Sequence, residues 1–189
     1  QSRLRQTAEA DQKRAQTEAV RSEQVARFLT DMLHGVGPGV AQGRDTTLLR
    51  DILDKTAERV ANDLATQPEV QGDLYFTLGQ TFADLTALAR AEDMFHRALE
   101  LYRTALTAPH RKLVHTLGHL AVAQVTQGNS AEAKPRAEEA LRMARALGDP
   151  KTLVAALRHQ ARALDPNQDI PEAVPFLREA LALQRQMGD

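Results

Sequence analysis

The feature that most constrains this chain is a pattern of small residues that recurs every 40 to 42 positions. Ala98 is followed by Ala140 after 42 residues and by Ala180 after a further 40. A second set of alanines, at positions 91, 133 and 173, repeats with the same two steps. Two landmarks in one register indicate repeated helix pairs that stack on one another. We therefore expect an all-α fold, a right-handed α-solenoid of antiparallel helix pairs behind a long N-terminal helix.

The first repeat also has a characteristic order of residue types. It runs Tyr75, Leu78, Gly79 and Phe82, then Ala91 and Phe95. This order resembles the tetratricopeptide pattern, with Tyr75 at a position where Trp is common. Gly79 and Ala91 are small enough to let the two helices of a pair approach closely. The later repeats keep small residues but lose the aromatics, and the step exceeds the usual period of about 34 residues, so we expect longer helices.

The chain divides into three parts in this interpretation. Residues 1–33 form a spacer or adaptor helix, residues 34–44 a Gly/Pro loop, and residues 45–189 the helical solenoid. The solenoid begins with an adaptor helix over 45–66, followed by repeats at about 68–108, 109–148 and 150–187. The adaptor helix is expected to be capped by Asp45 and to bury one apolar stripe, namely Leu49, Ile52, Leu53, Val60 and Leu64.

The N-terminal helix changes character along its length. It is polar as far as about Ser22 and gains apolar residues from Val25 onward. The polar part suits a solvated spacer or a weak coiled coil, which would offer a route to a homodimer. The sequence starts at Gln1 and not at Met, so we expect it to be a piece of a longer protein.

The order of elements before the repeats is similar to one known arrangement. A charged helix runs into residues 25–33, a Gly/Pro loop follows, and then come residues 46–54, residues 67–70 and the pair Leu78-Gly79. This resembles the C-terminal region of bacterial membrane-anchored serine/threonine protein kinases that carry tetratricopeptide repeats. The resemblance implies a sensory or scaffolding module of a signalling kinase. It also implies a parent protein in the inner membrane, with this region on a side that the resemblance leaves undetermined.

Composition excludes several kinds of partner and site. Lys and Arg number 24 against 25 for Asp and Glu, giving a net charge of -1, whereas nucleic-acid binders normally carry a basic excess. Cysteine is absent, so disulfides and thiolate metal sites are ruled out. No apolar run approaches the ~18 residues that a membrane span needs. A protein or peptide is therefore the expected partner, and no nucleic acid is.

No cofactor, metal or catalytic site is predicted. The Gly-rich run at residues 35–43 lacks both the preceding strand and the Lys-Ser/Thr pair of a phosphate loop. His115 and His119 have a spacing that can bind a metal, but no acidic residue or third histidine stands beside them in the sequence. A pair on a solvated helix face is the simpler interpretation. The acidic residues lie among Arg and Lys, as on solvated helices.

The remaining candidate site is the concave groove, which the first helix of each pair lines in such solenoids. The register predicts exposed groove positions in all three repeats: Asp73, Phe76, Gln80, Asp84, His115, His119, Val122, Arg158, His159 and Arg162. The chain itself is expected to be non-catalytic. The alternative to a kinase module is the helical-repeat arm of a bacterial transcription regulator or signalling ATPase. Whichever applies, the groove positions could also be ordinary surface residues.

Overall fold

The computed structural model describes residues 46–164 and 170–188. Within those two ranges the chain forms seven helices and no strand, so the all-α prediction is confirmed. The predicted N-terminal helix, the Gly/Pro loop and the Asp45 cap lie outside the described residues.

By its internal contacts the chain divides into two units, Gln1–Thr56 and Ala57–Asp189. The helix α2, Thr46–Asp63, runs across the division. It ends before the predicted limit of 66, because residues 64–66 turn the chain towards Pro68. Leu49, which we expected on the buried side, is 39% exposed. In the second unit, Val60 and Leu64 are buried.

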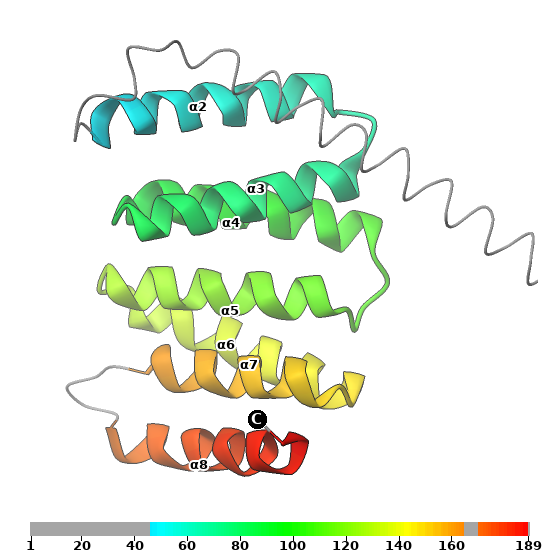
Figure 1. Ribbon diagram of the computed structural model, residues 1–189, viewed down its shortest axis with the longest axis vertical. Helices are drawn as coiled ribbons and strands as arrows, with labels where there is room; N and C mark the ends of the chain where they lie inside the picture. Colours follow the sequence, from blue (N-terminus) through cyan, green and yellow to red (C-terminus); the bar gives the residue numbers. More distant parts are fainter. Residues whose placement is uncertain (1–45, 165–169, 189) are drawn as a thin grey trace, which may run out of the picture. The chain divides into compact units, whose positions relative to one another are not determined.

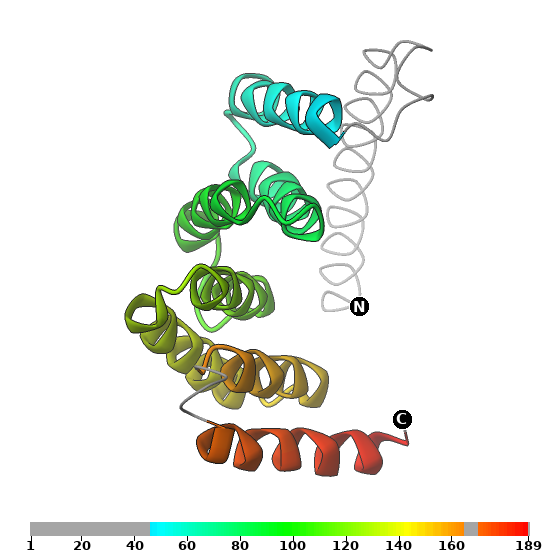
Figure 2. The same ribbon diagram turned by 90° about the vertical axis from the view of Figure 1, so that its left-hand side faces the viewer.

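The other six helices form three consecutive pairs (Figures 1 and 2). They are α3 (Pro68–Asp84) with α4 (Leu88–Ala105), α5 (Arg111–Thr126) with α6 (Ser130–Leu147), and α7 (Pro150–Arg162) with α8 (Ile170–Met187). The most extensive contacts lie within these pairs, and α4–α5, α5–α7 and α6–α7 contacts join one pair to the next. This is an all-α solenoid of the tetratricopeptide type.

The turns between the helices have clear local causes. Pro68 and Pro150 occupy the first turns of α3 and α7, where a missing N–H costs nothing. Gly148 ends α6 in the left-handed conformation with φ 68°, which glycine adopts without steric cost. The Asp149 side chain then caps α7 by accepting a 3.0 Å hydrogen bond from the backbone N–H of Thr152.

Two glycines let aromatic rings lie directly on the backbone of α3. A Cβ atom at Gly72 would stand 2.7 Å from Cε1 of Tyr102, and one at Gly79 would stand 2.6 Å from Cε1 of Phe95. Both rings belong to α4 and are almost fully buried. The α3–α4 pair therefore depends on missing side chains on one helix and large ones on the other.

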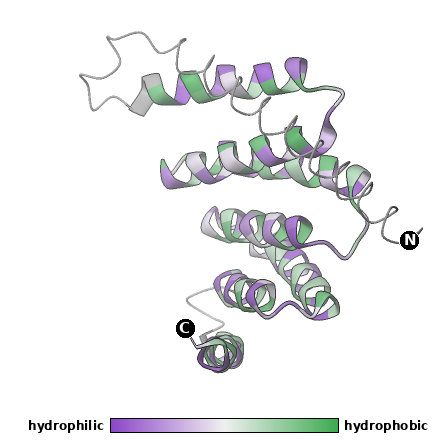
Figure 3. Cartoon of the chain, turned by 45° about the vertical axis from the view of Figure 1, so that its right-hand side comes forward, coloured by the Kyte–Doolittle hydropathy of each residue, from purple (hydrophilic) through white to green (hydrophobic). Residues whose placement is uncertain are grey.

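The later pairs pack through alanine instead. Ala121, Ala133, Ala137 and Ala163 form one buried cluster that joins α5, α6 and the end of α7. Figure 3 shows that each described helix carries both hydrophobic and hydrophilic positions, as expected of amphipathic helices with one buried side.

Ion pairs link the second helices of successive pairs. Arg103 of α4 forms an ion pair with Glu139 of α6, with Nη2 and Oε1 3.1 Å apart. Arg145 of α6 forms one with Glu179 of α8, with Nη2 and Oε2 3.1 Å apart. The arginines lie 42 residues apart and the glutamates 40 apart, so the pairs follow the repeat. Both arginines are about half exposed, so these pairs help to set the register more than they add to stability.

Candidate functional site

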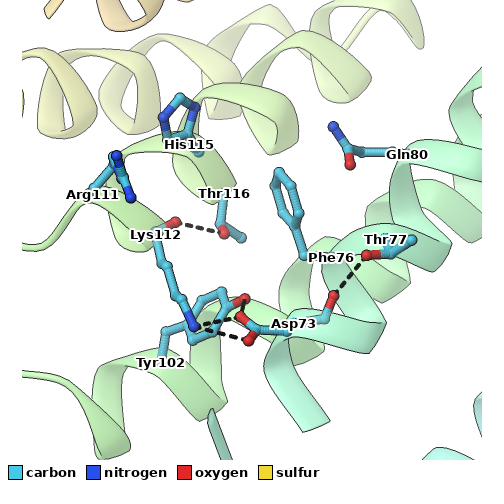
Figure 4. Close-up of a pocket in the computed structure, with 9 residues that line it drawn as sticks. All are labelled: Asp73, Phe76, Thr77, Gln80, Tyr102, Arg111, Lys112, His115 and Thr116. Carbon is cyan, nitrogen blue, oxygen red and sulfur yellow. Dashed lines mark hydrogen bonds and ion pairs between the residues drawn. The ribbon is translucent and has the colours of Figure 1, made fainter. Parts of the chain in front are cut away.

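The first candidate site is a cavity of about 330 Å³ between α3 and α5, with Tyr102 of α4 at its floor. The side chains that line it are drawn in Figure 4: Asp73, Phe76, Thr77, Gln80, Tyr102, Arg111, Lys112, His115 and Thr116. Most come from the first helices of the first two pairs. This is the face on which the register placed the groove.

The floor of this cavity is a network of charged and polar groups. The hydroxyl of Tyr102 donates a 2.6 Å hydrogen bond to Oδ1 of Asp73. Nζ of Lys112 lies 2.6 Å from the same carboxylate (Figure 4). It also lies 2.7 Å from Oε1 of Glu69. The ammonium also stands 5.4 Å from the centre of the Tyr102 ring, within range of a cation–π contact. Asp73 is thereby held in place by two helices.

This network determines what the floor can offer a ligand. Asp73 and Glu69 both accept hydrogen bonds from Lys112. The hydroxyl of Tyr102 already donates its hydrogen bond to Asp73. The polar floor is thus largely satisfied from within, and polar groups that already have partners gain little by exchanging them. The upper wall differs, because Arg111 is exposed and Gln80 and His115 are half-buried. Polar contacts with a ligand would come from that rim.

The apolar wall of the cavity is Phe76, which belongs to a chain of ring contacts. Its ring centre lies 5.7 Å from that of Phe95 and 5.3 Å from that of His119, the second contact being edge-on. Phe95 and His119 are 5.5 Å apart. Such separations suit favourable aromatic packing. Phe76 is therefore held upright between α4 and α5.

A second cavity, of about 520 Å³, adjoins the first. It lies over α3, α4, α5 and the end of α7, and its walls include Asp84, Phe95, His119, Val122 and Arg162. Thr77 and Gln80 line both cavities. The two cavities therefore meet at these residues and form one track across three helix pairs.

His119 and His159 lie against each other beneath this track. Their ring centres are 4.7 Å apart, and a Cβ atom at Gly118 would stand 2.6 Å from Cδ2 of His159. His159 is only 8% exposed. The expectation that His159 is an exposed groove residue was therefore wrong. The missing side chain of Gly118 leaves space on α5, and the imidazole from α7 fills it.

Burial keeps these histidines neutral. It lowers the pKa of His119 to about 4, with smaller contributions from its neighbours His115 and Arg162. Burial also lowers the pKa of His159 to about 3, with smaller contributions from nearby histidines and arginines, chiefly His119 and Arg162. The pKa of His115 is lowered by burial and by Arg111. His119 and His159 are therefore uncharged at neutral pH.

His115 and His119 also differ from the prediction. They were expected on a solvated face with no third histidine beside them, whereas both are half-buried and His159 lies next to His119. Within residues 46–164 and 170–188, no group of three or more His, Cys, Asp or Glu side chains could hold a metal ion. His119 and His159 therefore pack together without belonging to a ligand set.

Most of the predicted groove residues come together in the two cavities. Asp73, Phe76, Gln80 and His115 line the first, and Gln80, Asp84, His119, Val122 and Arg162 line the second. Arg158 is exposed and lines neither. Sequence reasoning missed Tyr102, Arg111 and Lys112. A signal for Tyr102 was present in Gly72, which stands seven residues before Gly79 and marks another ring contact.

Comparison with known protein families adds one finding. A family model described as tetratricopeptide repeat matches residues 71–146. These residues form a tetratricopeptide-repeat region. The match runs from the start of α3 to the end of α6 and so covers the first two helix pairs and the first cavity. A comparison with curated proteins gave no match.

The match gives general functional information. Tetratricopeptide repeats generally mediate protein–protein interaction and scaffolding, and regions built of them are typically non-catalytic. In the part of the chain that the structure describes, no helix is both long enough and apolar enough to span a bilayer.

Proposed function

We propose that this chain is a non-catalytic module that binds an extended segment of another protein along the track formed by the two cavities. The observation that carries the proposal is their shared wall at Thr77 and Gln80. One extended segment could place a side chain in each cavity without leaving the surface. Phe76 and Val122 would supply apolar contact, while Gln80, His115 and Arg162 would supply polar contact.

We further propose that the module is the sensory or scaffolding region of a bacterial membrane-anchored serine/threonine protein kinase. The support is the resemblance of the segment from Val25 to Val70, which precedes the repeats. In this proposal residues 1–33 and 45–66 act as an adaptor between the kinase and the solenoid, and the N-terminal helix can pair with a second copy. The repeats themselves would contact the partner.

Binding can be tested with peptides selected from a displayed random library on the wild-type chain. Thr77→Arg puts a long charged side chain at the wall that both cavities share. We expect it to weaken the binding of the selected peptides by about tenfold or more, equivalent to ~1.4 kcal/mol. Thr104→Arg is the matched control, because Thr104 is also exposed but lies on α4 at a separate cavity with Gln71, Tyr75 and Arg97. The proposed track would be overturned if Thr104→Arg weakened the binding of the selected peptides and Thr77→Arg did not.

The kinase assignment has a test of its own in the coding sequence upstream of Gln1. A membrane helix preceded by His-Arg-Asp and Asp-Phe-Gly signatures would support it. A phosphate loop or a helix-turn-helix would instead favour the arm of a signalling ATPase or transcription regulator. Either result leaves the peptide experiment unaffected.

A further inference from the structure

The last described helix exposes residues that its counterparts bury. In α4 the positions Phe95 and Leu99 are 1% and 3% exposed, and in α6 the equivalent Ala137 and Leu141 are 0% and 7% exposed. The next positions in the same register, Leu177 and Leu181 of α8, are each 48% exposed. Two large apolar side chains, one helical turn apart, therefore share an open face.

The earlier repeats show what covers this face elsewhere in the molecule. Phe95 of α4 contacts His119 of α5, with ring centres 5.5 Å apart. Ala137 of α6 belongs to the cluster that includes Ala163, next to the end of α7. In both cases the following pair supplies part of the cover, and the first helix of the same pair supplies the rest. No following pair among the described residues does so for Leu177 and Leu181.

The ion pairs of the second helices give an independent observation. Arg103 and Arg145 each bond a glutamate on the second helix of the following pair. Arg185 stands 40 residues after Arg145, in the same register. Among residues 46–164 and 170–188 it has no ion-pair partner. Arg185 therefore occupies the position at which Arg103 and Arg145 pair with a glutamate of the following helix pair.

The junction after α8 repeats the junction after α6 as well. Leu147-Gly148-Asp149 ends α6 and starts α7, and the sequence Met187-Gly188-Asp189 has the same form. Gly188 has φ 82°, in the left-handed region where Gly148 also lies with φ 68°. In the first junction the backbone turns at the glycine, and the aspartate then caps the next helix.

We propose that the face of α8 bearing Leu177 and Leu181 binds the first helix of a further tetratricopeptide-type pair, supplied by the same polypeptide. The second helix of that pair carries the acidic partner of Arg185. A second copy of this chain is a poorer occupant, because its first helices already have neighbours. Its α5 and α7 contact α4 and α6, and its α3 bonds Val60 and Ala57 through Gln71 and Tyr75. A solenoid end needs a polar outer face, and this face is apolar.

The proposal can be tested by lengthening the chain. A second copy of residues 149–188 is joined directly after Gly188, which reproduces the natural junction, and the double substitution Leu177→Ser with Leu181→Ser is made in both lengths. In the lengthened chain both leucines become buried, so we expect the melting temperature to fall by about 8 °C or more. In the 189-residue chain the same change should lower it by less than about 3 °C, because the side chains are half exposed.

A matched control uses neighbouring positions that are exposed in every pair. Ala182→Ser with Gln186→Ser replaces exposed residues whose counterparts on α4 and α6 are exposed too, so both lengths should respond equally. Equal responses to the leucine substitutions would overturn the proposal. So would a concentration-dependent dimer of the 189-residue chain that the leucine substitutions abolish. The coding sequence after Asp189 tests the source, and the lack of an apolar-periodic helix there would also overturn it.

Discussion

The first and last helix pairs reach close packing by opposite means. Between α3 and α4, glycines on one helix accept large rings from the other, as with Gly79 and Phe95. At the third pair, the tight glycine contact among the described residues lies between pairs, where Gly118 of α5 accepts the imidazole of His159 from α7. The first arrangement places an apolar ring at the tight contact, and the second places a titratable one. The tight contact at the third pair should therefore depend on pH, whereas the one at the first pair should not.

The largest expected effect is at the first pair. Gly79→Leu must fit a side chain where even a Cβ atom would stand 2.6 Å from Phe95, whose ring is fixed by Phe76 and His119. We expect a loss of ~1–3 kcal/mol or more in the free energy of unfolding, measured by urea denaturation. Thr77→Leu, at an exposed position of the same helix, is the control. If Gly79→Leu proved as stable as that control, our account of the α3–α4 contact would be wrong.

Acid should destabilise the contact between His119 and His159, which joins the second and third pairs. His119 and His159 have folded pKa values of about 4 and about 3, against 6.5 for the free side chain. Below pH 6.5 the unfolded chain binds protons that the folded chain does not. The contribution of these two histidines to stability is therefore fully present above that pH and declines as the pH falls towards 3, by a few kcal/mol in order of magnitude. Asp84 opposes this for His119, and Asp149 does so for His115.

The acid transition should also begin at the third pair. Both tyrosines, Tyr75 and Tyr102, lie in the first pair and the chain has no Trp, so tyrosine fluorescence reports on α3 and α4 while circular dichroism reports on all helices. We expect ellipticity to change at a higher pH than fluorescence. His159→Gln, which removes the titrating group of the third pair, should bring the two curves closer together. Coincident curves for the wild-type chain would show that the pairs unfold as one.

The smallest effects concern the ion pairs between successive pairs. Lys112→Ala removes a side chain that is 27% exposed and whose ammonium binds both Glu69 and Asp73. We expect the free energy of unfolding to fall by about 1–2 kcal/mol. Arg145→Ala removes an exposed partner of Glu179, and we expect a loss between about 0 and 1 kcal/mol. Urea denaturation of the two variants under one buffer gives the comparison. A larger loss for Arg145→Ala would reverse our ranking of the two junctions.

What the sequence could predict follows from how local each signal is. The step of the alanines and the order from Tyr75 to Phe95 were enough for the solenoid, because small residues at fixed intervals have few other uses. His159 was misplaced because its burial depends on Gly118, which lies 41 positions earlier on another helix. Lys112 and Tyr102 were missed for a similar reason. Their role arises only when α3, α4 and α5 bring them to Asp73.

The shared wall of the two cavities has a consequence for how binding preference can change. A ligand anchored in both cavities loses its translational freedom once, so that two weak contacts act with the strength of a chelate. Thr77 and Gln80 belong to both contacts. A single substitution at either residue would reshape both anchors together, so this surface should switch between partners in large steps and seldom drift gradually from one to another.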